Sequence, residues 1–499
     1  MTWSETSPAV EKIPASSHPA LRELVAAFVS HRARLASEGG DERPNGGRPL
    51  DVSPGSATIR SAEVVRPGRP GLISVISDAS GRLVHAVFGV QSPGGEPLDV
   101  SPGSVTIRSA EVVRPGRPGL ISVIADVSGQ LVHAVFGLRS PGDETQFLAD
   151  TDDSPLGIFE DTDGVAVVFD ATADAELMVC LLEAIGGATG EPERVRRIAF
   201  TENTVTVTFD DRLALTVFQQ LPPDQGPHPG LELFLALDGV GFNHLLAPVA
   251  IWRRGRTDLA IVQEYAAGST VGWSLALTSL RDLYAAGGEP GHAGGDFAVE
   301  ARRLGTMTAR MHLGLEEAFG RKTGNIAAWV TEVEDVVRPV APELLATDTV
   351  SVLLDDLRSS TTRCAAIRTH GDFHLGRVAR TDLGWYVLDF SSRGRPEFTA
   401  GVVEADGASY RSPLADVADM LWSFHHVAVV AAAERDPNDR LGLSELGRAW
   451  EGRNRRAFLA AYLATPGIGG LVPPERNVVR ELAAAFELER SASMMAIRP

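Results

Sequence analysis

Hydrophobic and polar residues alternate in short runs through the first part of the chain and recur every three or four residues through much of the rest. A period of two is typical of half-buried strands, and a spacing of three or four is typical of amphipathic helices. Strands are predicted at Val195–Phe200, Thr204–Phe209, Leu213–Phe218, Leu245–Trp252 and Leu259–Gln263. Helices are predicted at Leu21–Leu35, Ala173–Ile185, Phe297–Phe319, Val350–Ser359, Leu443–Thr465 and Glu475–Glu489, and from Ser412 onward.

An internal repeat lies in the first part of the chain, where Pro49–Glu96 and Pro97–Glu144 align without gaps at a period of 48 residues. Each copy predicts three short strands separated by Gly- and Pro-containing turns. Two copies are too few for a solenoid, so we interpret the repeat as a duplicated β-meander. It either widens a cap or adds a docking surface, or it is a neutral addition to an existing sheet. The copies differ only at Ala57/Val105, Ser77/Ala125, Ala79/Val127, Arg82/Gln130, Val90/Leu138, Gln91/Arg139 and Gly95/Asp143.

Two acidic residues follow apolar runs later in the chain. Asp372 lies in Thr369-His370-Gly371-Asp372-Phe373-His374-Leu375-Gly376, and Asp389 follows Trp385-Tyr386-Val387-Leu388. We expect two adjacent strands joined by a tight turn to hold both carboxylates at the mouth of one cleft. This arrangement suits phosphoryl transfer, in which one carboxylate accepts a hydroxyl proton and another holds Mg²⁺. A zinc pair formed by His370 and His374 is an alternative.

The HGDxHxG motif and the hydrophobic-Asp-Phe step about 17 residues later resemble those of bacterial maltokinases and actinobacterial glucosamine kinases, within the aminoglycoside-phosphotransferase-like kinases. Gln263-Glu264-Tyr265, Gly272-Trp273 and the LGxxTAxMH stretch at 304–312 resemble the same family, over roughly Gly157 to Arg490. The resemblance implies an α+β, bilobal protein-kinase-like fold with an N-terminal β-rich cap domain that contains the duplicated meander. The implied domains are an N-terminal helix and flexible linker at 1–48, the cap at 49–190, a kinase-like N-lobe at 191–267 and an α-rich C-lobe at 268–499.

The resemblance also implies cofactors. ATP and Mg²⁺ are expected, with Asp372 as the catalytic base and Asp389 as the magnesium ligand. Carboxylate oxygens are the ligands that a hard cation such as Mg²⁺ prefers. The adenine is expected to hydrogen-bond to the backbone of the hinge formed by Gln263, Glu264 and Tyr265.

Four further residues are assigned to the substrate side of the site by the resemblance. His370 and His374 are expected to brace the catalytic loop or touch the sugar. Arg411 and Asp416 are expected to tether that loop or contact the sugar. His312 in the preceding helix is interpreted as a core histidine with its hydrogen bonds satisfied.

Three positions depart from the family pattern. Thr216 stands where a phosphate-clamping lysine is usual, which leaves Glu232 on the next helix without its counter-charge. Arg377 stands where an amide helps to hold the metal, and an arginine repels Mg²⁺ although it can neutralise phosphate directly. Ser391 replaces a second acid. The chain has only two lysines, Lys12 and Lys322, so the nearest substitutes for the missing lysine are Arg212, Arg253 and Arg254.

These departures leave three functional hypotheses open. The first is an ATP-dependent sugar kinase that acts on a glucosamine-like or maltose-like hydroxyl. The second is a catalytically impaired pseudokinase that binds nucleotide or sugar and regulates a partner. The third is an antibiotic phosphotransferase of the aminoglycoside type.

The composition of the chain limits the classes of partner that it is expected to bind. The chain has 499 residues, 44% of them hydrophobic and 22% charged, which is typical of a globular protein of two or three domains. A net charge of −19 argues against nucleic acid and against an anionic membrane surface. Two cysteines, no apolar stretch long enough to span a membrane and no N-terminal leader pattern predict a cytoplasmic protein. We expect a monomer or weak dimer whose partners are a small sugar and ATP.

Overall fold

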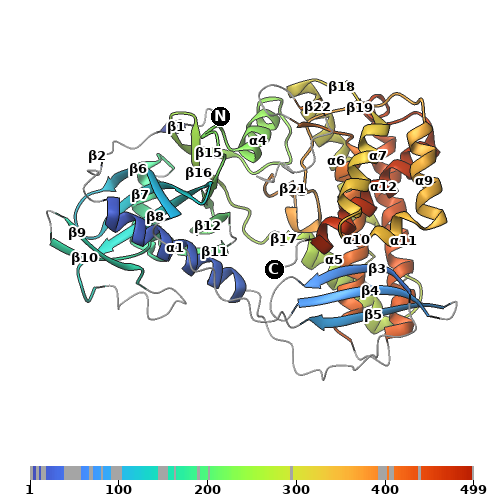
Figure 1. The fold of residues 1–499 in the computed structure, drawn as a ribbon, viewed down its shortest axis with the longest axis horizontal. Helices are drawn as coiled ribbons and strands as arrows, with labels where there is room; N and C mark the ends of the chain where they lie inside the picture. Colours follow the sequence, from blue (N-terminus) through green and yellow to red (C-terminus); the bar gives the residue numbers. More distant parts are fainter. Residues whose placement is uncertain are drawn as a thin grey trace. The chain divides into compact units, whose positions relative to one another are not determined.

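The structure is a computed structural model of the chain. It describes residues 4–6, 11–12, 18–38, 58–66, 71–79, 82–90, 104–143, 155–161, 164–187, 192–200, 203–292, 296–390, 402–403, 409–435 and 440–496. Contacts between residues divide the chain into two compact units (Figure 1). Unit 1 comprises residues 1–44, 93–228 and 246–267, and unit 2 comprises residues 45–92, 229–245 and 268–499. The four-domain division predicted from the sequence stays a prediction.

The first sheet of unit 1 has six strands in the order β1-β15-β16-β13-β12-β11. Predicted strands β11 (Val195–Phe200), β12 (Thr204–Phe209) and β13 (Leu213–Phe218) are confirmed at the expected bounds. Strands β15 (Pro248–Arg254) and β16 (Thr257–Glu264) differ from the predicted bounds by a few residues, and Leu245 forms an isolated bridge with Val387 instead of belonging to β15. The short strand β1 (Ser4–Thr6) pairs in parallel with β15 and was not predicted.

The second sheet of unit 1 follows the order β2-β6-β7-β8-β10-β9, and β14 (Gln220–Leu221) also pairs with β8. Helix α1 (His18–Glu38) contributes Leu21, Val25 and Phe28 to the hydrophobic core of this sheet. The ring of Phe28 meets that of Phe136 edge to face, with centroids 5.7 Å apart. The remaining elements are β2 (Glu11–Lys12), β6 (Val105–Arg114), β7 (Gly119–Val127), β8 (Gln130–Arg139), β9 (Gly157–Asp161), β10 (Gly164–Asp170) and α3 (Ala175–Ala184).

The two repeat copies form the same meander but belong to different sheets. In the first copy β3 (Thr58–Arg66), β4 (Gly71–Ala79) and β5 (Arg82–Val90) form a sheet of three strands. Thr58 pairs with Asp78 in this copy, as Thr106 pairs with Asp126 in the second, so the register is conserved. Only the second copy, β6 to β8, joins the larger sheet with β2, β10 and β14.

Unit 2 is mostly helical. The periodic stretch from Phe297 forms α6 (Ala298–Phe319), which packs against α11 (Arg440–Ala464). Helix α10 (Leu414–Ala433) is buried along most of its length and packs against both α11 and α12 (Arg476–Ala496) (Figure 1). The other helices are α4 (Pro229–Gly239), α5 (Gly272–Ala286), α7 (Ile326–Val337), α8 (Pro342–Leu345) and α9 (Asp348–Ser359).

The strands of unit 2 that flank the catalytic motif are short. β19 (Ala365–Ala366) precedes the motif and pairs with β18 (Lys322–Thr323). After the motif, η4 (Leu375–Arg377), a single turn of 3₁₀ helix, leads into the hairpin of β20 (Val378–Arg380) and β21 (Trp385–Val387), and β17 (Thr270–Val271) extends this sheet. The sequence had suggested that two adjacent strands carry the two acids, and the structure does not show this arrangement. A loop carries the first acid.

In the described residues no helix is both long enough and apolar enough to cross a bilayer.

Candidate active site

The loop that carries Asp372 is held in place by the fully buried carboxylate of Asp416. Its Oδ2 accepts hydrogen bonds from the backbone N–H of His370 at 2.8 Å and from His312 Nε2 at 3.1 Å. Its Oδ1 accepts from the N–H of Gly371 at 2.9 Å, and Gly371 adopts a φ of 85°, which favours glycine. Asp416 also lies in the first turn of α10, where the helix dipole favours negative charge. Of the two roles expected for Asp416, the geometry supports the tether.

A second contact joins this tether to the helical core. His312 on α6 is fully buried, and its Nδ1 lies 2.9 Å from the hydroxyl of Tyr462 on α11. Burial alone would raise the pKa of Asp416, but the hydrogen bond from His312 and the bonds to the loop hold it below its usual value. Asp416 is thus an ionised carboxylate with three donors, which is how a protein keeps a charge in its interior. His312 is the buried core histidine that the sequence predicted.

Asp372 and Asp389 are brought together by one arginine. Arg377 donates from Nη2 to Asp372 Oδ2 at 3.0 Å and from Nη1 to Asp389 Oδ2 at 2.5 Å. Asp372 is largely enclosed, with 19% of its side chain exposed, whereas 52% of the Asp389 side chain is exposed. A planar guanidinium can span two carboxylates because its donors point in fixed directions. Residues that the sequence placed at one cleft therefore share a single cation.

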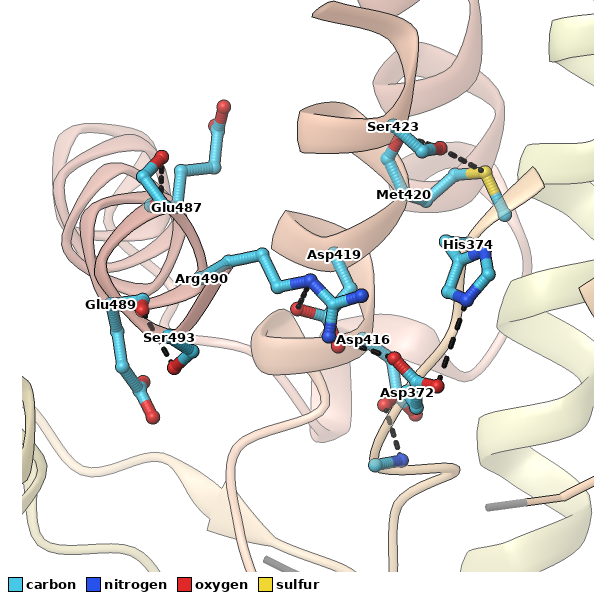
Figure 2. A network of polar contacts seen from close by, with 12 residues as sticks. Asp372, His374, Asp416, Asp419, Met420, Ser423, Glu487, Glu489, Arg490 and Ser493 are labelled. Carbon is cyan, nitrogen blue, oxygen red and sulfur yellow. Dashed lines mark hydrogen bonds and ion pairs between the residues drawn. The ribbon is translucent and has the colours of Figure 1, made fainter. Parts of the chain in front are cut away.

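A second arginine, which the sequence analysis missed, holds the other oxygen of Asp372. Arg490 on α12 donates from Nη1 to Asp372 Oδ1 at 2.7 Å. Figure 2 shows its side chain extending from α12 toward Asp372 beside Asp419, whose Oδ1 lies 3.8 Å from Arg490 Nε. The guanidinium also lies 5.2 Å from the ring centroid of Trp422. Nothing in the local sequence around Arg490 identifies this role, because its partner lies 118 residues earlier.

His374 and the two arginines together determine the charge state of Asp372. Burial would raise its pKa, but the contact with His374 and the charges of Arg490 and Arg377 hold the pKa of Asp372 well below its usual value. His374 Nε2 lies 3.6 Å from Asp372 Oδ2, which is longer than a hydrogen bond but close enough for an electrostatic contact (Figure 2). Asp372 is therefore a carboxylate at neutral pH. It can accept a proton but not donate one.

The remaining substrate-side residues differ in their surroundings. His370 is buried, its Nε2 lies 2.8 Å from the backbone oxygen of Asp389, and burial lowers its pKa. His374 accepts a hydrogen bond from the N–H of Gly376 at 3.1 Å, which begins the 3₁₀ turn η4. The backbone of Arg411 pairs with Ile367 at the start of the loop, and its side chain forms ion pairs with Glu332 and Glu489. His370 and Arg411 thus brace the loop, and His374 is the residue of this set that lies beside Asp372.

Glu232 is not without a counter-charge, as the sequence had suggested. Its Oε2 accepts a hydrogen bond from Arg368 Nη2 at 2.8 Å. Arg368 lies two residues before His370, so α4 is connected by this ion pair to the start of the catalytic loop. The pairing could not be foreseen because 136 residues separate the partners.

Of the expected nucleotide-binding residues, Arg377 lies in unit 2 and the other four lie in unit 1. Thr216 is central in β13, and its hydroxyl lies 3.0 Å from that of Thr206 on β12. Gln263 and Glu264 end β16, and the N–H of Tyr265 donates to the carbonyl of Arg212 at 2.8 Å. The arginines considered as substitutes for a lysine have other surroundings: Arg253 pairs with Asp258 at 2.6 Å, Arg254 pairs with Glu111 at 2.7 Å, and Arg212 is exposed.

The acid pair does not fit a magnesium ion in this arrangement. Magnesium prefers carboxylate oxygens together with several waters. Here the guanidinium of Arg377 lies against both Asp372 and Asp389. Within the part of the chain that the structure describes, no group of three or more His, Cys, Asp or Glu side chains could hold a metal ion. The zinc alternative for His370 and His374 finds no support there, and Ser391 lies outside the described residues.

No model of a known protein family matches the sequence. Comparison with individual proteins finds similar glucosamine kinases. The chain is 30% identical over 327 residues to a glucosamine kinase of Streptacidiphilus jiangxiensis, a match that spans 59% of this chain and 67% of that protein. It is 28% identical over 225 residues to a glucosamine kinase of Mycolicibacterium smegmatis, spanning 42% of this chain and about half, 53%, of that protein.

One solved structure, a glucosamine kinase in complex with glucosamine, ADP and inorganic phosphate, matches with a TM-score of 0.53 at 21% identity. The match covers 79% of this chain and 90% of that structure. At this identity the likeness concerns the fold alone. The α+β, kinase-like fold class predicted from the sequence is thereby confirmed.

Proposed function

The chain belongs to the glucosamine kinase family, a family of sugar phosphotransferases, and from this premise we propose that it transfers the γ-phosphoryl group of ATP to a hydroxyl of a small sugar. A glucosamine-like or maltose-like acceptor suits the resemblance. The single observation that supports this proposal within the structure is the environment of Asp372, an enclosed and ionised carboxylate on a tethered loop.

In the proposed reaction Asp372 accepts the proton of the sugar hydroxyl. The hydroxyl oxygen forms a bond to the γ-phosphorus while the bond from that phosphorus to the bridging oxygen of ADP breaks. Such a transfer needs positioning and charge neutralisation more than covalent chemistry. Arg490 and Arg377 provide positioning, because each holds one oxygen of Asp372. They also make Asp372 a weak base, so the proton moves late, as the leaving group departs.

The roles expected for the nucleotide-binding residues are part of the proposal. Gln263, Glu264 and Tyr265 are proposed to receive the adenine through their backbone, with Thr216 and Arg377 on the phosphate side. The role of Asp389 as a ligand of the metal that accompanies ATP stays a prediction, because Arg377 contacts its carboxylate in this arrangement. Sugar contact is proposed for His374. For His370, Arg411 and Asp416 the bracing role is proposed instead, because these three hold the loop.

A second candidate function is a pseudokinase that binds nucleotide or sugar without useful turnover. Two observations favour it. The hydroxyl of Thr216 lies beside that of Thr206, where a lysine ammonium would be expected to serve the phosphates. Arg377 also lies against both acids at once. Loss of one charged phosphate ligand typically costs about two to three decades of rate.

A phosphoryl-transfer assay with radiolabelled ATP separates the two candidates. Glucosamine, maltose and an aminoglycoside are offered as acceptors to the wild type, to Asp372→Asn and to Asp382→Asn. Asp382 is an exposed acid in the turn between β20 and β21, so its variant is a matched control. We expect wild-type turnover that falls by about two to four decades in Asp372→Asn and persists in the control.

Two results would contradict the kinase proposal. Equal turnover in wild type and Asp372→Asn would mean that Asp372 is not the base. A thermal shift with ATP but no phosphorylation of any acceptor would favour the pseudokinase. The cytoplasmic location and the monomer or weak dimer stay predictions.

A further inference from the structure

Arg377 contacts the carboxylates of both acids, and it does so with separate nitrogens, whereas His370 contacts only their backbone atoms. Nη1 lies 2.5 Å from Asp389 Oδ2 and Nη2 lies 3.0 Å from Asp372 Oδ2. The charges of Asp389 and Asp372 raise the pKa of Arg377, against the effect of burial, so its charge is permanent. One fixed cation thus lies against two carboxylates.

This is also the environment in which a divalent cation would bind. Magnesium would coordinate a carboxylate oxygen at about 2.1 Å. If it bound the Asp389 oxygen that Arg377 contacts, the ion and Nη1 would be at most about 4.6 Å apart, the sum of that bond length and the observed contact. Charges of the same sign at such a distance repel strongly at a partly enclosed site. Arg377 and the ion therefore cannot share the pair in this arrangement.

We propose that Arg377 is a built-in competitor of divalent cations at the Asp372–Asp389 pair, so that a cation binds there only when the guanidinium leaves. The place of this competition in catalysis rests on the proposed function. The competition itself is a property of three side chains, and it can be measured without nucleotide or sugar.

The surroundings of the pair fit this proposal. Asp372 retains Arg490 on its other oxygen when Arg377 is removed, so its carboxylate stays oriented (Figure 2). Asp389 loses the cation that contacts its exposed carboxylate, and that carboxylate becomes available to a hydrated ion. The other charged or titratable groups nearby are His370 and His374 on the same loop, Asp416 and Asp419 on α10, and Arg490 on α12. Of these groups, Arg490 is the one that brings a permanent positive charge.

The test measures Mn²⁺ binding to the full chain by calorimetry at low ionic strength, with no nucleotide present. Wild type is compared with Arg377→Gln, with Arg377→Asn as a second replacement, and with Arg380→Gln. Arg380 lies on β20, directly after the turn that holds Arg377, and pairs with Glu300 at 2.8 Å, so its variant removes an equal charge away from the acid pair. We expect the Arg377 variants to bind Mn²⁺ at least about tenfold more tightly than wild type, and Arg380→Gln to match wild type. The gain should disappear when Asp389→Asn is added.

Three results would overturn the proposal. These are wild-type binding as tight as that of both Arg377 variants, an equal gain in Arg380→Gln, and a gain that survives Asp389→Asn. Thermal unfolding of each protein verifies that the variants are folded. The wild-type titration tests the proposal even if a variant fails to fold, because tight Mn²⁺ binding at the pair in wild type contradicts the competition. Absent turnover together with the expected gain would refute the kinase but support this inference.

Discussion

The two repeat copies differ at seven positions, and these differences predict which copy the large sheet of unit 1 can accommodate. Deleting residues 49–96 or residues 97–144 leaves two chains of equal length that differ only at those positions. In the second copy Val105, Val127 and Leu138 are at most 8% exposed and Ala125 is fully buried. The first copy has Ala57, Ala79, Val90 and Ser77 at the corresponding positions.

The expected loss in the free energy of unfolding follows from the groups that each replacement removes. Shortening two valines to alanine and one leucine to valine costs roughly 4 kcal/mol at about 0.8 kcal/mol per buried methylene. Placing the hydroxyl of Ser77 at the buried position of Ala125 adds about 1–3 kcal/mol. Arg139 Nη2 lies 2.7 Å from the buried carboxylate of Asp174, and the first copy has Gln91 there, so a charged hydrogen bond of about 1.5–3 kcal/mol is also lost. The total is comparable to the whole stability of a typical domain.

Urea unfolding of both deletion chains tests this reasoning. We expect the chain without residues 49–96 to keep a midpoint close to that of wild type. The chain without residues 97–144 should be strongly destabilised or should fail to fold. Arg139→Gln in the stable deletion isolates the ion pair. Equal midpoints for the two deletions, whether close to that of wild type or equally lowered, would refute the reasoning.

Three further predictions concern the active site and the pH dependence. Arg490→Gln should raise the pKa of Asp372 and move the acid limb of kcat/KM upward by about one pH unit or more, and an unmoved limb would exclude the assigned contact. Asp416→Asn should cost about 3 kcal/mol in urea unfolding and reduce turnover, because two loop N–H groups and His312 lose a charged partner; wild-type stability would show that the tether is dispensable. Burial lowers the pKa of His133 to about 4, so the unfolded chain takes up its proton first as pH falls. Stability should therefore decrease between pH 6.5 and 4 by about 3 kcal/mol from this residue, and His133→Gln should reduce that dependence.

The periodicity of apolar residues along the sequence was sufficient to predict many of the strands and helices. Strands β11 to β13 begin and end at the predicted residues, and the spacing of apolar residues from Phe297 identified α6. These features could be predicted because a strand or helix depends on which neighbouring residues share one face. The HGDxHxG motif predicted a catalytic role for Asp372, which stays a proposal, and the burial of His312 was correctly inferred from its position in a helical pattern.

Only the tertiary structure decided which side chains meet. Arg490 reaches Asp372 across 118 residues, Arg377 spans both acids, and Arg368 gives Glu232 the counter-charge that the sequence had denied it. The same holds for the repeat, because both copies carry one strand pattern and one register, yet a single copy joins the larger sheet. The pattern of apolar residues specifies which face of an element is buried and the register of a hairpin. The partner of a charged side chain or of a sheet edge depends on how distant segments pack. The spacing of residues along the chain does not determine that packing.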